Sequence, residues 1–523
     1  ATEQTWKGFL VAMLAVQFVS LIFTYLILRY QDHLPLNPMN LPGVPADLAF
    51  NTAVSFTTNT NWQNYTGEQT MSYLSQMVAL VIHNFVSAAT GFALAIALVR
   101  AMSSRRMSTV GNFYVDLTRS ILYVLLPMSL VAAVFLASQG VIQSLAAYPI
   151  AHTLDGGVQQ LLAVGPFASQ EAIKELGNNG GGPFNANSAH PFENPNAFTN
   201  ELEVFLLLVL PFALVVMFGR WVGNVKQGLA IAVAMAIILV TGIGVAMAAE
   251  QIGNPALTQA GANQSATSTQ SGGNMEGKSV MNGAGYSAFF AASTTGTSTG
   301  SVDSSHDSFT PVGGLVPLVL IQLGEIAPGG VGAGLYFMLV FAVLSVFIAG
   351  LMVGRTPEYL GKKIESKEVR LAALAILIDV VSILGFTALS AVWSLAKSQA
   401  GGPLNPGAHG FSEILYAFSS TTGNNGSAFA GLSGNTHYYN ITLGIAMWLG
   451  RYLEVIPILA LAGSLAGKKV VPAGAGTLPT DSKLFTALLI GVIAIVGALT
   501  FFPALALGPI LEQLQLAAGQ LAH

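Results

Sequence analysis

Two polar stretches of this sequence repeat one pattern of hydroxyl, amide and glycine residues between long apolar segments. Residues 292–302 read ASTTGTSTGSV, and residues 419–429 read SSTTGNNGSAF. Serine, threonine and asparagine supply neutral oxygen atoms, and glycine permits the positive φ angles that turn successive carbonyl groups to one side. Rings of such oxygens can replace the water around an alkali metal ion. The stretches therefore predict a site for a monovalent cation.

Two further stretches of the same kind extend the pattern to four polar runs. In register, the runs are Thr58-Asn59-Thr60-Asn61, Gly177-Asn178-Asn179-Gly180, Thr297-Ser298-Thr299-Gly300 and Gly423-Asn424-Asn425-Gly426. The last position is glycine three times and asparagine once, and asparagine tolerates positive φ better than most residues. A second register, based on the TTG triplets at 294–296 and 421–423, is open for the third and fourth runs.

The four runs supply the candidate ligands of an ion filter. These are Thr58, Asn59, Thr60, Asn61, Asn178, Asn179, Gly180, Ser298, Thr299, Gly300, Asn424, Asn425 and Gly426. A single Gly-rich stretch is usually only a loop, but four at matching positions favour a pore. The runs contain no Asp or Glu, which sites for divalent cations usually recruit. We therefore expect K⁺ to be the ion.

Composition places the chain in a membrane. Of its 523 residues, 53% are hydrophobic and only 8% are charged, and the mean hydropathy is +0.62. A soluble protein would carry about a quarter charged residues. The net charge of −4 does not suggest nucleic acid as a partner, and the absence of cysteine excludes disulfides and thiolate metal sites.

Nine apolar segments are long enough to cross a bilayer, which takes about 20 helical residues. They are 8–29, 74–99, 117–138, 202–219, 228–249, 313–353, 370–395, 438–465 and 483–508. The sixth is too long for one crossing. It carries Pro328, Gly329 and Gly330 in its middle, so we expect a broken helix there.

Each of the four polar runs follows a stretch that is long enough for a short helix. These stretches are LAFNTAVSF (48–56), SQEAIKEL (169–176), YSAFFAAS (286–293) and FSEILYAFS (411–419). The unit of span, short helix, polar run and span thus occurs four times. Irregular backbone at membrane depth survives only where it lines a cavity or is packed in protein.

The predicted fold is therefore an all-α polytopic membrane protein. Its four pseudo-symmetric repeats of span, pore helix, filter and span surround a central pore, and an extra C-terminal helix follows. The predicted units are repeats 1–99, 100–219, 220–353 and 354–465, with the last transmembrane helix in 466–523.

Basic residues orient the predicted spans. Most Lys and Arg residues, from Arg100 to Lys483, fall in the loops that alternate with the loops of the polar runs. The loops of the polar runs hold only Lys174, Lys278 and Lys397. By the positive-inside rule the basic loops are cytoplasmic, and the polar runs and the C-terminus lie outside.

Long motifs give the sequence a family resemblance. They include TNTNWQNYTGE (58–68), SQEAIKELGNNGGGPFNANSAHPFENP (169–195), GLMVGRTPEYLGKKI (350–364) and NNGSAFAGLSGN (424–435). In these motifs the chain resembles the potassium-binding subunits of the bacterial Kdp potassium-transporting ATPases, in the superfamily of potassium transporters. The resemblance extends over essentially the whole sequence.

The resemblance implies a function and a set of partners. The potassium-binding subunit takes up external K⁺ through its filter and passes the ion to a separate P-type ATPase subunit (the B subunit). The small C and F subunits complete the complex, which lies with its lipid in the bacterial inner membrane. The family usually has one further helix before residue 1. It also typically has threonine at the position of Asn178, and apolar residues at those of Asp379 and Glu454.

The resemblance also gives places to residues outside the runs. It puts Gln63 at the outer vestibule and Arg451 below the filter, where a fixed positive charge would oppose cation leakage. Gly329 and Gly330 belong to the break that would block straight passage. The alternatives are a solvated loop position for Gln63, and for Arg451 a structural pair with Glu454, three residues on.

The sequence disfavours an enzyme. It has neither a G-x-x-x-x-G-K-[ST] phosphate loop nor an Asp-Lys-Thr-Gly phosphorylation motif. Its cytoplasmic loops of ~10–20 residues are too short for a nucleotide domain, which needs roughly 100. We therefore expect no catalytic centre and no bound nucleotide in this chain. A stand-alone potassium channel or symporter with the same filter remains the alternative function.

Overall fold

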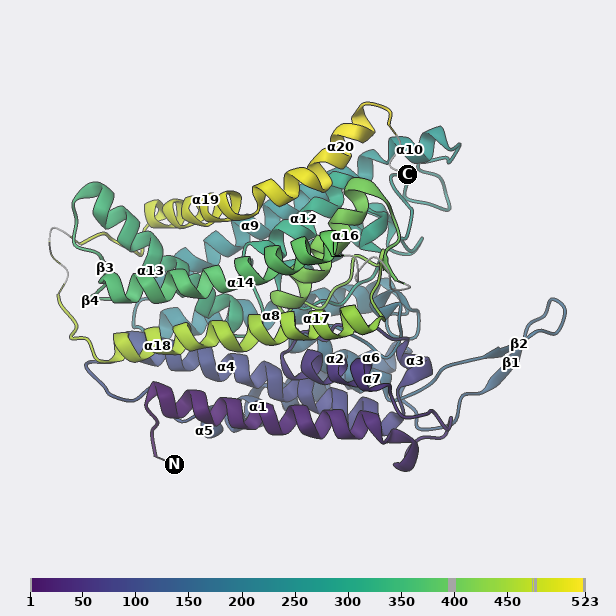
Figure 1. The fold of residues 1–523 in the computed structure, drawn as a ribbon, viewed down its shortest axis with the longest axis horizontal. Coiled ribbons are helices and arrows are strands. Elements are labelled where there is room, and N and C mark those ends of the chain that lie inside the picture. Colours follow the sequence, from purple (N-terminus) through teal and green to yellow (C-terminus); the bar gives the residue numbers. More distant parts are fainter. Residues whose placement is uncertain (1, 394–400, 473, 475–476, 521–523) are drawn as a thin grey trace.

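The computed structural model describes residues 2–393, 401–472, 474 and 477–520. Lys397, which contributed to the charge pattern, and residues 394–395 of the seventh predicted span lie outside the described residues. The described chain is a bundle of long, roughly aligned helices, with its N-terminus and C-terminus at opposite ends (Figure 1).

Nine helical stretches of the described chain are long and apolar enough to cross a membrane. They are α1 (Trp6–Arg29), η2 (Ser75–Val81) with α4 (Ile82–Ser103), α5 (Phe113–Ser120) with η3 (Ile121–Leu125) and α6 (Leu126–Ser138), α8 (Ala197–Trp221), α9 (Val225–Ile252) with α10 (Pro255–Gln259), α13 (Ala333–Val353), α14 (Ser366–Val392), α17 (His437–Trp448) with η6 (Leu449–Leu453) and α18 (Glu454–Ala466), and α19 (Lys483–Leu507) with α20 (Pro509–Ala517). The nine predicted spans are confirmed, with most ends shifted by a few residues. The sixth is the exception, because the spanning helix begins only at Ala333, after the break in the predicted segment 313–353.

The outer surface of the bundle is apolar, whereas its interior holds polar groups. Val11, Val131 and Val381 expose about two thirds of their side chains. The four polar runs are buried, apart from the partly exposed Gly423 and Gly426 of the fourth run. This arrangement suits a protein surrounded by lipid, because apolar side chains lose nothing in contact with hydrocarbon while polar backbone must be satisfied inside.

Four short helices carry the predicted pore-helix sequences. They are α2 (Ala46–Thr57), α7 (Phe167–Leu176), α11 (Gly283–Gly296) and α16 (Gly407–Thr422). Each ends directly before one of the polar runs. The predicted order of span, short helix, polar run and span is therefore present in every quarter of the chain.

The predicted break in the sixth span is also present. Helix α12 (Pro311–Gln322) is separated from α13 by a linker, residues 323–332. The linker cannot continue the helix because Gly324, Gly329 and Gly332 all have positive φ. A Cβ atom on Gly332 would lie 2.0 Å from the carbonyl oxygen of Gly91, so glycine also permits close packing on α4.

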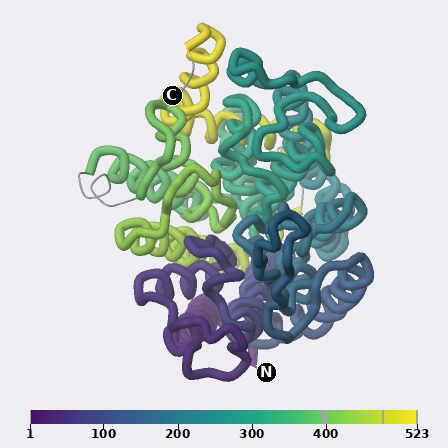
Figure 2. Tube along the Cα trace, turned by 90° about the vertical axis from the view of Figure 1, so that its right-hand side faces the viewer, coloured from purple at the N-terminus to yellow at the C-terminus, as the bar shows by residue number. Residues whose placement is uncertain are grey.

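The four quarters of the chain occupy successive sectors around a common centre (Figure 2). The last quarter contacts the first, because α17 packs on α2 and the Asn51 side chain donates a 2.9 Å hydrogen bond to the carbonyl of Asn440. This contact closes the arrangement into a ring. The residue boundaries at 99, 219, 353 and 465 remain predictions.

Short two-stranded sheets connect the loops. Strand β1 (Ile150–His152) pairs antiparallel with β2 (Gln159–Leu161) in a hairpin that projects from the bundle (Figure 1). The pairs β3 (Glu358–Tyr359) with β4 (Lys362–Lys363), and β5 (Gly402–Pro403) with β6 (Leu432–Ser433), are also antiparallel. The last pair ties the loop before α16 to the loop after the fourth run.

At the end of the bundle that holds the polar runs, a histidine connects the last helix to the fourth quarter. The Nε2 atom of His409, on α16, lies 2.9 Å from Asp307 Oδ1, and its Nδ1 atom lies 2.7 Å from Glu512 Oε1 on α20. Burial lowers the pKa of His409, but hydrogen bonds to the two carboxylates outweigh it and raise this pKa to about 10.

We expect His409→Gln to lower the unfolding free energy by about 2 kcal/mol at pH 6. The folded pKa exceeds the unfolded value of about 6.5. The contribution is therefore complete below pH 6.5 and is lost as the pH rises toward 10. Thermal unfolding of the wild type and of His409→Gln between pH 6 and about 10 measures the difference in their unfolding free energies. His33→Gln, at an exposed histidine, is the control. If the difference in unfolding free energy did not change with pH, the charged state of His409 could not be its cause.

Candidate ion-binding site

The four polar runs share one backbone conformation. The second position of each run has positive φ, at Asn59 (72°), Asn178 (49°), Ser298 (55°) and Asn424 (60°). The fourth position also has positive φ, at Asn61 (51°), Gly180 (65°), Gly300 (90°) and Gly426 (95°). Left-handed residues at alternate positions turn successive carbonyls to the same side.

The common conformation distinguishes the two registers that the sequence left open. In the TTG register, Gly296 and Gly423 would take the place of the left-handed glycines. Gly296 instead lies within α11, and Gly423 has a φ of −68° at the end of α16. The structure therefore aligns the runs in the first register.

Side-chain hydrogen bonds connect neighbouring runs in cyclic order. Each run donates to the next, and the fourth donates to the first. The bonds are Asn59 Nδ2 to Asn178 O (2.7 Å), Asn178 Nδ2 to Thr299 Oγ1 (2.9 Å), Ser298 Oγ to Asn424 O (3.3 Å) and Asn424 Nδ2 to Thr60 Oγ1 (2.8 Å). The runs therefore converge on one site.

The glycines at the fourth position allow the runs to approach one another. A Cβ atom there would collide with a carbonyl oxygen of the next run: Thr299 O at 2.1 Å for Gly180, Asn425 O at 2.1 Å for Gly300 and Thr60 O at 1.7 Å for Gly426. Asn61 is the exception. Its side-chain amide donates to Gly180 O at 2.9 Å and to Asn84 Oδ1 at 2.8 Å, so both of its N–H groups are bonded.

The short helices hold the runs by backbone bonds. In each run the third amide donates to a carbonyl five residues earlier: Thr60 to Ser55 (2.9 Å), Asn179 to Lys174 (2.8 Å), Thr299 to Thr294 (3.0 Å) and Asn425 to Ser420 (2.8 Å). Because these amides bond to the helices and not to the runs, carbonyl groups of the runs remain available to an ion. The carboxyl end of each helix carries partial negative charge, which favours a cation.

A vestibule of about 820 Å³ lies above the fourth positions of the runs. Its lining includes Asn61, Gly300 and Gly426, together with Gln63. The Gln63 side chain exchanges two 2.9 Å hydrogen bonds with the backbone of Gly182. Gln63 is thus a bonded part of the vestibule wall rather than a solvated loop residue. The described lining contains no charged side chain.

The linker of the broken helix lies against the third run. The amide of Gly329 donates a 2.8 Å hydrogen bond to the carbonyl of Gly296, at the end of α11. A Cβ atom on Gly330 would lie 3.2 Å from Ser298 Cβ. Gly329 and Gly330 therefore pack against the end of the run that is opposite the vestibule.

Arg451 lies on the same side as the linker. It is buried in η6, a segment of π-helix. Its Nη1 atom lies 3.4 Å from Tyr336 Oη, and a Cβ on the adjacent Gly450 would lie 1.8 Å from the carbonyl oxygen of Thr422. Among the ion pairs of the described residues there is none between Arg451 and Glu454. The guanidinium thus faces the interior instead of forming the alternative pair.

Asp379 and Glu454 face each other beside this region. A small cavity of about 30 Å³ is lined by Asp379, Gly423 and Phe337, between α13, α14 and α19. This cavity lies beside the fourth run rather than on the axis of the four runs. Gly423, the first residue of the fourth run, is part of the cavity wall.

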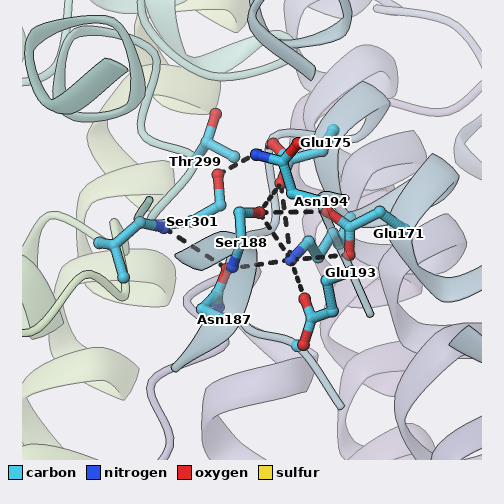
Figure 3. Close-up of polar contacts among 12 residues, drawn as sticks. Glu171, Glu175, Asn187, Ser188, Glu193, Asn194, Thr299 and Ser301 are labelled. Carbon is cyan, nitrogen blue, oxygen red and sulfur yellow. Dashed lines mark hydrogen bonds and ion pairs between the residues drawn. The ribbon is translucent and has the colours of Figure 1, made fainter. Parts of the chain in front are cut away.

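Sequence reasoning missed a buried ionic cluster beside the second run. The charge pattern places Lys174 in an outer loop, but its side chain has no exposure and lies within 4 Å of Glu171, Glu175 and Glu193. Figure 3 labels these three glutamates. The spacing of Glu171, Lys174 and Glu175 on a predicted pore helix was the available signal, since such a helix is enclosed by protein.

A family model with the description "KdpA: Potassium-transporting ATPase A subunit" matches residues 1–514. The chain belongs to this family. The family membership confirms the resemblance that the motifs indicated, and it fits the four-run arrangement described above.

Individual relatives agree with this family membership. A potassium-transporting ATPase potassium-binding subunit from Solibacter usitatus is 56% identical over 521 residues, which are 100% of this chain and 90% of that protein. A protein of the same description from Rhodospirillum centenum is 56% identical over 523 residues, 100% of this chain and 89% of its own.

The chain also resembles a solved transporter. The crystal structure of the potassium transporter TrkH from Vibrio parahaemolyticus matches with a TM-score of 0.54, covering 88% of this chain and 85% of that chain. Because the two sequences are only 14% identical, the match concerns the fold alone. It confirms the predicted class, a helical multi-span membrane protein with a pseudo-symmetric transporter fold.

Proposed function

We propose that this chain is the potassium-binding subunit of a Kdp-type potassium-transporting ATPase and that its four polar runs form the selectivity filter. The observation that carries the proposal is the cyclic set of hydrogen bonds from each run to the next. These bonds fix neutral oxygens from every quarter of the chain around one site. Neutral oxygens suit a monovalent ion, and relatives at 56% identity carry the potassium-binding description.

The runs and the vestibule face outside in this proposal. The basic residues concentrate in loops at the opposite end of the helices, which the positive-inside rule assigns to the cytoplasm. External K⁺ enters the neutral vestibule, passes Gln63 and loses its water between the run oxygens. The chain lies in the bacterial inner membrane.

The ion leaves the filter sideways in this proposal. The linker with Gly329 and Gly330 lies under the third run, and the Arg451 guanidinium opposes a cation on the axis. The cavity beside Asp379 offers a lateral space. From there the ion passes to a separate P-type ATPase, the B subunit, with the small C and F subunits completing the complex. In this proposal the B subunit hydrolyses ATP and so supplies the energy for transport, which this chain does not derive from ATP itself.

Purification of the chain from its native membrane tests this function against the alternative of a stand-alone channel or symporter. The proposal requires an ATPase chain to co-purify and the complex to hydrolyse ATP in response to K⁺, with little response to Na⁺. Passive K⁺ current from this chain alone, without any ATPase partner, would establish the alternative. Binding isotherms for K⁺, Rb⁺ and Na⁺ on the same preparation give the selectivity.

A further inference from the structure

One of the four quarters departs from the others at the residue that anchors its polar run. The anchoring carbonyl belongs to Ser55, Lys174, Thr294 or Ser420. In the first, third and fourth quarters this residue has a small hydroxyl group that bonds backbone locally, as Ser420 Oγ accepts from Gly426 N at 3.0 Å. Only the second quarter has a long charged side chain at this position.

The Lys174 ammonium group is fixed by its surroundings. It donates to Glu193 Oε2 at 2.6 Å, to Asn187 Oδ1 at 2.9 Å and to Ser188 Oγ at 3.2 Å. It also forms an ion pair with Glu171 Oε2 at 2.9 Å. All three hydrogens of the ammonium therefore have partners. The carbonyl of the same residue accepts from Asn179 at 2.8 Å and from Gly180 at 3.1 Å.

The cluster holds more carboxyl groups than cations. Glu171, Glu175, Glu193 and Glu203 have no exposure, and Lys174 is the cation that pairs with this group. Burial raises the pKa of the Glu193 carboxyl well above its usual range, while Lys174 opposes the increase. Both carboxyl oxygens of Glu203 lack a hydrogen-bond partner within the described chain. Loss of the ammonium would leave buried acids uncompensated.

The cluster reaches the residue that directly follows the third run. The hydroxyl of Ser301, the residue after Gly300, donates to Glu175 Oε2 at 2.9 Å (Figure 3). Ser188 Oγ donates to Glu171 Oε1 at 3.1 Å, so the loop after the second run belongs to the same network. Side-chain bonds therefore connect the anchor of the second run to the end of the third.

We propose that Lys174 is a positioning residue for ion selection, and that its cluster sets the spacing between the second and third runs through Glu175 and Ser301. The inference rests on the proposed function of the runs. Buried charge-assisted bonds resist displacement more than neutral ones. The two linked runs therefore keep their separation around K⁺ and do not adjust to the larger Rb⁺.

The test uses the assembled ATPase complex and measures the K⁺ and Rb⁺ concentrations that give half-maximal ATP hydrolysis, together with the maximal rate. We expect Lys174→Met to raise the K⁺ value about fivefold and to reduce the preference for K⁺ over Rb⁺, with the maximal rate retained. Ser301→Ala, which keeps the cluster but removes its bond to the third run, reduces the same preference.

Lys278→Met is the matched control. The Lys278 side chain is also fully buried and lies 2.8 Å from Glu250 Oε2, but its hydrogen bonds and ion pairs within the described chain reach none of the polar runs. This variant should lose stability without changing the ratio of the K⁺ and Rb⁺ values. If it shifts the ratio as much as Lys174→Met, the effect is general destabilisation and the inference is wrong.

The remaining outcomes are also decisive. If Lys174→Met does not assemble into the complex, the ratio of the half-maximal K⁺ and Rb⁺ concentrations in Ser301→Ala alone tests the inference. An unchanged ratio in Ser301→Ala overturns the inference. The proposed function is judged separately by Gly180→Asp: if that variant loses K⁺ while Ser301→Ala keeps the wild-type ratio, only the inference fails. If Gly180→Asp binds K⁺ normally, the filter assignment fails and the inference with it.

Discussion

Gly180→Asp is expected to lower K⁺ affinity by at least about a hundredfold. A Cβ atom at this position would lie 2.1 Å from Thr299 O and 2.6 Å from the carbonyl carbon of Gly300. The residue also has a φ of +65°, which costs aspartate more than glycine, although less than most other residues. The second and third runs must therefore separate, and their oxygens no longer fit one ion. K⁺-binding isotherms on the purified complex measure the loss.

Gly407→Asp is the control for this substitution. Gly407 has nearly the same φ, +67°, but nothing lies within 4 Å of a Cβ atom there. The backbone strain and the added charge are then similar, and the collision is absent. We expect near-normal K⁺ binding in the control. If Gly180→Asp also binds K⁺ normally, the placement of the second run in the filter is wrong.

Arg451→Ala is expected to increase passive K⁺ leakage through the complex about thirtyfold. A unit charge roughly 8 Å from a passing ion, at an effective dielectric constant of about 20, raises the energy of that ion by about 2 kcal/mol, which is about thirtyfold in population. Alanine removes this barrier. Fluxes of K⁺ into vesicles that contain the complex, without ATP, measure the leak.

Two substitutions identify the cause of such a leak. Arg451→Lys keeps a positive charge and should leak much less than Arg451→Ala. Arg100→Ala removes an arginine that pairs with Asp116 at 3.1 Å, next to the basic loops and outside the filter region, and should not leak. A leak-free Arg451→Ala protein with wild-type affinity would exclude the role of this charge.

Hydropathy and repetition were sufficient to predict most of the fold. The spans were predictable because about 20 apolar residues in succession have no stable place but the bilayer or a large core. The short helices and the break at Pro328 were predictable from the interruptions of this pattern. Helix α20 and the β1–β2 hairpin were not predictable. Neither of them interrupts a long apolar segment, and neither belongs to the fourfold repeat.

The sequence located the four polar runs but left two registers open for the third and fourth. The triplets TTG at 294–296 and 421–423 have the same composition as the runs, and only the backbone conformation shows that Gly296 belongs to a helix. Lys174 was missed for another reason. A count of charges by loop cannot distinguish a solvated lysine from one enclosed by carboxylates, because that difference depends on contacts with Glu193 and Asn187.

The bond from Asn424 to Thr60 joins residues 364 positions apart in the chain. A nascent polypeptide therefore exposes the first three runs before their final neighbour has left the ribosome. Until the fourth arrives, Thr60 lacks its bond from Asn424 and the ring of runs is open on one side. If the four runs hold the ion as proposed, this ability arises only late in biosynthesis, and products that end before the fourth run should lack it.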